Sequence, residues 1–202
     1  MKIIVTTCDK YKHLLKGFSE RFMQHWGDDF FVDIAGKDES WSDQMNRVCR
    51  SFNEEYFIRL CEDFWLSEQV DYNGLFLAWR YAVAGKLDRV GLQSVFDGYE
   101  HCSKKDEKTG WFKLDPDAEY LCSFEASIWN RQFLLKHLKR GEHIWDAEIR
   151  MSKAARGANV LVPPKPIVFY KDATRRGQER AKIVDGHMHV LQPGDIWKDV
   201  DV

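Results

Sequence analysis

The sequence predicts an α/β fold in which helices cover both faces of a mixed but mostly parallel central sheet. Apolar, β-branched runs alternate along the first third of the chain with segments whose apolar residues recur at helical spacing. Strands that alternate with helices in this way pair in parallel, because each helix returns the chain to the same edge of the sheet. A length of 202 residues suits one such domain, so we expect residues 1–202 to form a single unit.

The first third of the chain predicts strand, helix, strand, helix, strand. Residues 2–7 form the first expected strand, and apolar residues at helical spacing follow over 11–22. A second strand is expected at 30–34. The next helix begins near Ser42, which we expect to be its N-cap. The third strand, 56–61, is mostly apolar and ends directly before two carboxylates.

The remaining residues predict a less regular succession of elements. Asn130 is expected to cap a helix, with Gly141 at its C′ position. The expected elements, in order, are a helix at 75–83, a strand at 90–92, a long loop or hairpin at 97–119, a strand at 120–124, the helix after Asn130, a helix at 145–155, strands at 160–162 and 167–170, and a polar, basic tail from 171.

Composition limits the functional classes. A net charge of −2 argues against a wholly basic nucleic-acid binder but leaves room for a local basic patch. Eight tryptophans suit stacking on sugars or bases as well as core packing. Five cysteines without a CxxC pair favour a reducing compartment, and no stretch approaches the roughly 20 apolar residues of a membrane span. We therefore expect a cytoplasmic protein without a transmembrane segment.

Two adjacent acids, Glu62 and Asp63, carry the main functional signal. They follow a buried strand, and ligands of open α/β sheets bind at the carboxyl ends of the strands. Carboxylates there can hold a hard divalent cation, which in turn can neutralise a diphosphate leaving group. The alternative is a solvated acidic loop.

The loop after the first strand reaches the same predicted edge. Its Thr7, Asp9 and Tyr11 offer a hydroxyl, an acid and an aromatic ring that could hold a ribose and stack on a base. Alternatively, Thr7 or Asp9 caps the helix that follows.

Other side chains later in the chain could take part in chemistry. Asp146 and Glu148 lie near a helix start, where either could be a general base or simply oppose the helix dipole. Arg176, within a basic run, could clamp a pyrophosphate or be a solvated turn residue. His187 and His189 give a weak metal signal, since a lone histidine is more often structural. The motifs GxSxG, GxxxxGK[ST] and GxGxxG do not occur, which removes the usual support for hydrolase, P-loop and Rossmann classes.

The order of these parts resembles small bacterial and phage glycosyltransferases of the GT-A fold. The pattern runs TTCDKY, WS, EDFW, SIWN and W-x-x-E, and the resemblance spans about residues 1–150. It implies a hexosyl- or pentosyltransferase with a nucleotide-sugar donor, first of all a UDP-sugar. Residues 1–95 would bind this donor and 96–202 the acceptor.

The resemblance also implies roles for single residues. Asp63 would take the last position of a DxD-like motif that binds Mn²⁺ or Mg²⁺ and the donor phosphates, with Cys61 where the family has its first acid. His187 or His189 would complete the metal shell. Glu148, or second Asp146, would be the base of an inverting displacement. The donor contacts would come from Thr7, Asp9, Tyr11, Trp41, Ser42, Glu62, Asp63 and Arg176.

The acceptor stays open at this stage. The family modifies cell-envelope polysaccharides, proteins or, in some phages, hydroxymethylated DNA bases. Three basic segments of this chain are compatible with DNA as the acceptor. Two other classes compete with glycosyl transfer. One is a nucleotidyltransferase, which would normally need a Gly-rich loop after the first strand. The other is a non-catalytic module that binds carbohydrate or nucleic acid.

Overall fold

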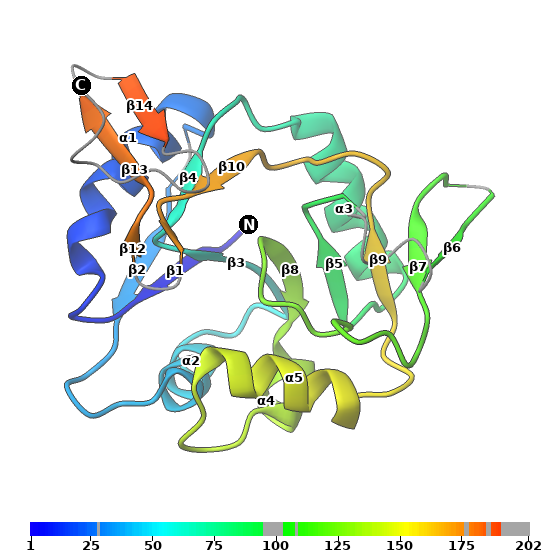
Figure 1. Ribbon diagram of the computed structural model, residues 1–202. Helices are drawn as coiled ribbons and strands as arrows, with labels where there is room; N and C mark the ends of the chain where they lie inside the picture. Colours follow the sequence, from blue (N-terminus) through cyan, green and yellow to red (C-terminus); the bar gives the residue numbers. More distant parts are fainter. Residues whose placement is uncertain (28, 95–102, 108, 176–177, 185–186, 191–202) are drawn as a thin grey trace.

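The computed structural model describes residues 1–202 except 28, 95–102, 108, 176–177, 185–186 and 191–202 (Figure 1). Its centre is an eight-stranded sheet of order β2-β1-β3-β8-β5-β9-β7-β6. These strands are β1 Ile3–Thr7, β2 Phe31–Ile34, β3 Tyr56–Cys61, β5 Arg89–Gly91, β6 Ser103–Lys105, β7 Phe112–Leu114, β8 Ser127–Asn130 and β9 Val160–Val162.

Three two-stranded sheets and six helical segments complete the described chain. The small sheets are β4 Phe64–Leu66 with β10 Tyr170–Asp172, β11 Thr174–Arg175 with β12 Gln178–Glu179, and β13 Ala181–Val184 with β14 His187–Val190. The helices are the 3-10 turn η1 Lys12–Leu14, α1 Leu15–His25, α2 Trp41–Arg50, α3 Tyr72–Ala84, α4 Arg131–His137 and α5 Ile144–Ala154. No helix in the described ranges is long and apolar enough to cross a bilayer.

The strand directions confirm a mixed, mostly parallel sheet. β1 pairs in parallel with both β2 and β3, so the first third of the chain has the predicted alternation. β8 runs antiparallel between β3 and β5. Within the eight-stranded sheet, all strands except β7 and β8 point the same way. The carboxyl ends of β1 and β3 therefore meet at one edge, with Thr6 in register with Cys61.

Each face of the sheet packs on its own set of helices. Alternate residues of β3 separate the two layers: Phe57 lies in the cluster with Met45 of α2 and Met151 of α5, and Leu60 lies in the cluster with Phe18 of α1. In Figure 1, α2, α4 and α5 lie together on one side of the sheet. Helices therefore cover both faces, as the sequence predicts.

Close packing of α1 fixes the strand that follows the acidic pair. Gly17 is buried in α1, and a Cβ built on it would lie only 2.2 Å from Cζ2 of Trp65 in β4. The indole thus occupies the space that any larger side chain at position 17 would need. Gly17 is required by this contact and not by its backbone conformation.

Replacing Gly17 tests that contact. Alanine improves helix propensity by about 1 kcal/mol, but the overlap with Trp65 must shift an indole that is 5% exposed. We expect Gly17→Ala to lower the free energy of unfolding by roughly 1–3 kcal/mol in urea denaturation. Gly36→Ala is the matched control, because its Cβ would lie an ordinary 3.7 Å from Glu39. Equal stability of Gly17→Ala and the wild type would contradict the packing.

Three local predictions are wrong here, and a fourth, the strand expected at 167–170, is described with the functional site. Ser40, not Ser42, is the N-cap of α2: its extended backbone lets Oγ accept from Asp43 N at 3.1 Å. Residues 120–124 form a turn and irregular backbone instead of a strand: Leu121, Cys122 and Phe124 fill the core, while β8 supplies the strand next to β3. Asn130 does cap α4. That helix ends at His137, so Gly141, with φ of +80°, belongs to the following loop.

Candidate functional site

The acidic pair lies in the turn between β3 and β4, at the sheet edge shared with the end of β1. Cys61, Glu62 and Asp63 each present one ligand atom, and these three atoms lie within 4.8 Å of one another. Strand β3 is buried along almost all its length, which fixes the position of the turn. We call residues 61–63 the acidic turn.

Burial makes the two carboxylates costly to ionise. Glu62 is 8% exposed, and burial, followed by the neighbouring Asp63, raises its pKa to about 7. Hydrogen bonding from Thr7 and the charge of Arg59 only partly offset this rise. Burial likewise raises the pKa of Asp63, against a hydrogen bond of 3.0 Å that Thr174 Oγ1 donates to Oδ2. The site holds more negative charge than its own residues neutralise.

This donor set fits a hard divalent cation held by oxygen. Thr174 Oγ1 donates to Asp63 Oδ2, and a backbone N–H also helps to hold this carboxylate, yet burial still raises its pKa. Cys61 is a poor ligand, because its Sγ accepts an N–H from Arg59 Nη2 at 2.8 Å and burial raises the pKa of the thiol. Cys61 therefore departs from the family pattern without supplying a hard ligand in its place.

A segment from the end of the chain holds the acidic turn. β10 pairs with β4, and the Tyr170 ring stacks on Phe64 with centroids 4.2 Å apart. Ala173 N then donates to the Asp63 carbonyl at 2.8 Å. We call residues 170–174 the strap. The sequence did not predict it, since a strand was expected at 167–170 and not at Tyr170–Asp172.

Three predicted residues of the C-terminal region stay predictions. Arg176 lies outside the described residues. The backbone of β14 places His187 opposite Val184 and His189 opposite Lys182. The side chains of both histidines are outside the description.

A buried arginine connects the acidic turn with the second half of the chain. Arg59 is 1% exposed, and its guanidinium lies 5.6 Å from the Trp41 ring centroid and 5.7 Å from that of Phe124. Besides Cys61, it donates to the carbonyl oxygen of Phe124. Within the described chain Arg59 forms no ion pair with a carboxylate.

The backbone of Phe124 also positions Glu148. The N–H of Phe124 donates to Glu148 Oε1 at 2.8 Å, while its carbonyl oxygen accepts from Arg59, so Glu148 and Arg59 both bind the backbone of this residue. Glu148 is half-buried on α5, whereas Asp146 is exposed near the start of that helix. Of the two predicted bases, Glu148 is thus the one tied to the acidic turn.

Sequence reasoning missed Glu125. This side chain is half-buried, and burial raises its pKa to about 7; Glu148 and Asp172 raise the pKa further, while Arg89 lowers it. Burial raises the pKa of Tyr170, and the carboxylate of Glu125 raises it further, together with Asp172, Cys61 and Asp63. Glu125 therefore lies in the same acidic neighbourhood. The available signal was a single acid inside the apolar run 120–130.

The last residue of β1 lies at the acidic turn, and the loop that follows it reaches the surface. Thr7 is 4% exposed and its hydroxyl bonds to Glu62, so the structure brings it to the acidic turn. Asp9 is exposed and pairs with Lys12 at 3.0 Å, and Lys10 lies 4.8 Å from the centroid of the half-buried Tyr11 ring. Neither Thr7 nor Asp9 caps a helix, since η1 and α1 have no side-chain cap.

Trp41 is half-buried and Ser42 is buried. The Trp41 ring packs against Phe124 with centroids 4.4 Å apart, directly over Arg59. Ser42 is 1% exposed and its Oγ accepts from Glu142 N at 2.8 Å, which joins the start of α2 to the segment before α5. These contacts give Ser42 a structural role, and we leave it out of the donor contacts proposed below.

The raised pKa values predict an unusual dependence of stability on pH. Glu62 and Glu125 have folded pKa values of about 7, above the ordinary 4.5, so folding favours their protonated forms. Their contribution to stability is present below about pH 4.5 and is lost as pH rises toward 7. In metal-free buffer, we expect the melting temperature to fall between pH 5 and 8, and to fall less in Glu62→Gln and Glu125→Gln. Parallel curves for wild type and both variants would contradict the assignment.

Comparison with known proteins identifies the architecture. No protein-family model and no curated protein sequence matches the chain. Among solved structures, A197 from STIV is similar, with a TM-score of 0.53 at 9% identity over 95% of each chain. S. aureus TarS 1–349 in complex with UDP-GlcNAc gives a TM-score of 0.53 at 11% identity, covering 89% of this chain and 60% of TarS 1–349. The chain has the GT-A fold.

That result confirms the fold implied by the sequence resemblance. At 9–11% identity it speaks for the fold alone. The chain also spans 60% of the TarS fragment, less than two thirds, so donor, acceptor and metal use are matters for proposal.

Proposed function

We propose that this protein is a metal-assisted glycosyltransferase that moves a sugar from a nucleotide-diphosphate donor to a hydroxyl acceptor. The observation that carries the proposal is the acidic turn: the buried Glu62 and the half-buried Asp63, both with raised pKa values, at the carboxyl end of β3 in a GT-A fold. Neighbouring TarS was solved with UDP-GlcNAc, which favours a UDP-sugar as donor.

The donor would lie across residues 1–95. Thr7, at the end of β1, adjoins the acids, and Asp9 and Tyr11 follow it on the accessible loop, where a ribose and base can be held. Asp63 would hold Mn²⁺ or Mg²⁺, joined by His187 or His189. Such an ion supplies positive charge against the departing diphosphate. Glu62 shapes the sugar pocket beside it.

The acceptor side would be formed by residues 96–202, with Glu148 as the proton acceptor. In an inverting displacement its carboxylate takes the proton of the acceptor hydroxyl as the new C–O bond forms at the anomeric carbon. The bond from that carbon to the diphosphate oxygen breaks, and nucleoside diphosphate leaves. The hydrogen bond from Phe124 N orients the carboxylate, and Glu125 lies close enough to be the second candidate.

Product analysis tests this proposal and separates it from its competitors. The full chain is incubated with UDP-, GDP- and CMP-sugars and Mn²⁺ or Mg²⁺, and the released nucleotide is quantified. Nucleoside diphosphate release (or, for a CMP-sugar, nucleoside monophosphate) that stops on chelation supports the transferase. Pyrophosphate release from nucleoside triphosphate and sugar phosphate would identify a nucleotidyltransferase. Acceptor binding without any donor binding would identify a non-catalytic module.

A cytoplasmic location stays a prediction. Cys8, Cys49, Cys61 and Cys122 are all free thiols in the described chain. Free thiols are typical of proteins in a reducing compartment.

A further inference from the structure

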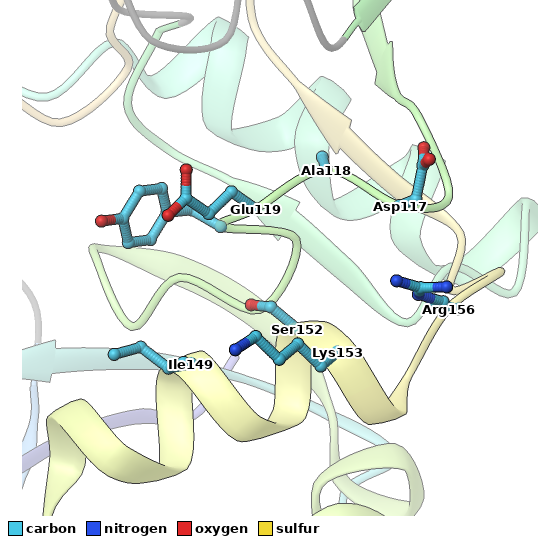
Figure 2. A pocket seen from close by; sticks show the side chains of 8 residues that line it. Asp117, Ala118, Glu119, Ile149, Ser152, Lys153 and Arg156 are labelled. Atoms are coloured by element: carbon cyan, nitrogen blue, oxygen red, sulfur yellow. The ribbon is translucent and has the colours of Figure 1, made fainter.

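A pocket on α5 lies apart from the acidic turn (Figure 2). Its volume is about 270 Å³. One wall is the loop that leads from β7 toward β8, and the other is the part of α5 that carries Ile149, Ser152 and Lys153, with Arg156 just beyond the helix. The lining side chains are Asp117, Ala118, Glu119, Tyr120, Ile149, Ser152, Lys153 and Arg156.

Helical spacing joins this pocket to the proposed base. Ile149 and Lys153 follow Trp145 at intervals of four residues, so the three lie along one face of α5. Glu148 borders the same face, and Ser152 lies four residues further, about 6 Å along the helix axis. The opposite wall is linked as well, because Tyr120 and the Glu148-bound Phe124 belong to the same loop. The lining of the pocket on α5 thus begins at Ile149, the residue directly after Glu148.

The pocket combines one exposed flat ring with balanced charge, and a second ring lies beside it. Tyr120, which lines the pocket, is 46% exposed. Trp145, one helical turn before the lining residue Ile149, is 65% exposed, so a ligand that extends along α5 can cover both rings. Two acids, Asp117 and Glu119, stand with the cations of Lys153 and Arg156, and no ion pair joins any of the four in the described chain. The lining thus presents hydrogen-bond donors and acceptors with no net charge.

We propose that this pocket is the acceptor subsite and that it takes a neutral saccharide; the inference rests on the proposed glycosyltransferase function. The apolar face of a pyranose suits the rings of Trp145 and Tyr120, and its hydroxyls can both donate to the acids and accept from the cations. A DNA backbone fits worse, because its phosphates would meet Asp117 and Glu119. The structure thus favours polysaccharide over modified DNA.

Binding measurements without donor test the subsite. The full chain is applied to an array of neutral oligosaccharides and, in parallel, to duplex DNA with and without hydroxymethylcytosine. We expect saccharide binding that weakens about tenfold or more in Trp145→Ala and in Tyr120→Ala. Phe76→Ala is the matched control, since Phe76 is 63% exposed on α3, and it should bind as the wild type does.

Several results would overturn the subsite. These are absence of saccharide binding by the wild type, preference for either DNA, or equal loss in Phe76→Ala. Thermal stabilisation by UDP-sugar and Mn²⁺ is measured on the same variants and should be unchanged. Its persistence alongside a failed array would reject the acceptor pocket alone, whereas its absence from the wild type would reject the glycosyltransferase function.

Discussion

Asp63→Asn should abolish most activity while leaving the fold intact. Removing the carboxylate charge from the acidic turn removes the ligand proposed for Mn²⁺ or Mg²⁺, and a bound metal contributes several kcal/mol to transition-state stabilisation. We expect nucleotide release to fall roughly 100-fold or more. Asparagine can still accept the hydrogen bond from Thr174, and the burial that raises the pKa of Asp63 then carries no penalty. The metal-free variant should therefore melt at or above the wild-type temperature.

Two readouts make this prediction specific to the site. Thermal stabilisation by Mn²⁺ with UDP-sugar should disappear in Asp63→Asn, because only the folded, liganded state gains from binding. Asp38→Asn removes an exposed acid from the loop after β2 and should behave as the wild type. An Asp63→Asn variant that keeps full activity would exclude the acidic turn as the metal site.

Glu148→Gln should lower kcat by about 10²- to 10⁴-fold with little change in the KM for the donor. The amide cannot take a proton from the acceptor hydroxyl, and general-base catalysis contributes a factor of that size. The carbonyl oxygen of the glutamine can still accept from Phe124 N. The loop should therefore keep its conformation, and Arg59 should keep its hydrogen bond to the Phe124 carbonyl oxygen. Steady-state kinetics with varied donor and acceptor measure both constants.

The neighbouring acids supply the controls for this variant. Asp146→Asn, at an exposed position near the start of α5, should retain activity. If Glu125→Gln loses activity and Glu148→Gln does not, the proton acceptor is Glu125, and Glu148 only holds the loop. If Asp146→Asn is the inactive variant, the assignment of both half-buried acids is wrong.

Regular periodicity explains why the first half of the fold was predictable. Apolar runs of strand length alternate there with helical spacing, and parallel pairing of β1, β2 and β3 follows from chain direction alone. The acidic turn was predictable for the same reason, because it directly follows the buried strand β3. The strand expected at 120–124 was wrong, since buried turns and buried strands have the same apolar composition and cannot be told apart by it.

Contacts between distant segments were not predictable from one sequence. In the sequence, Arg59 is simply a charged residue within a predicted strand. Its hydrogen bonds to Cys61 and to the carbonyl of Phe124 are visible only in the folded structure. The strap at 170–174 reaches Asp63 across more than 100 residues, with Thr174 and Asp63 separated by 111. Glu125 became a candidate for the same reason: its raised pKa depends on burial that local pattern does not reveal.

A crystal structure with Mn²⁺ and UDP would show whether Asp63 holds the metal, because the anomalous signal of manganese locates the ion. We expect manganese bound by the Asp63 carboxylate and by the UDP diphosphate, with the nucleotide along the loop after β1. Manganese and UDP bound together away from residues 61–63 would contradict this expectation.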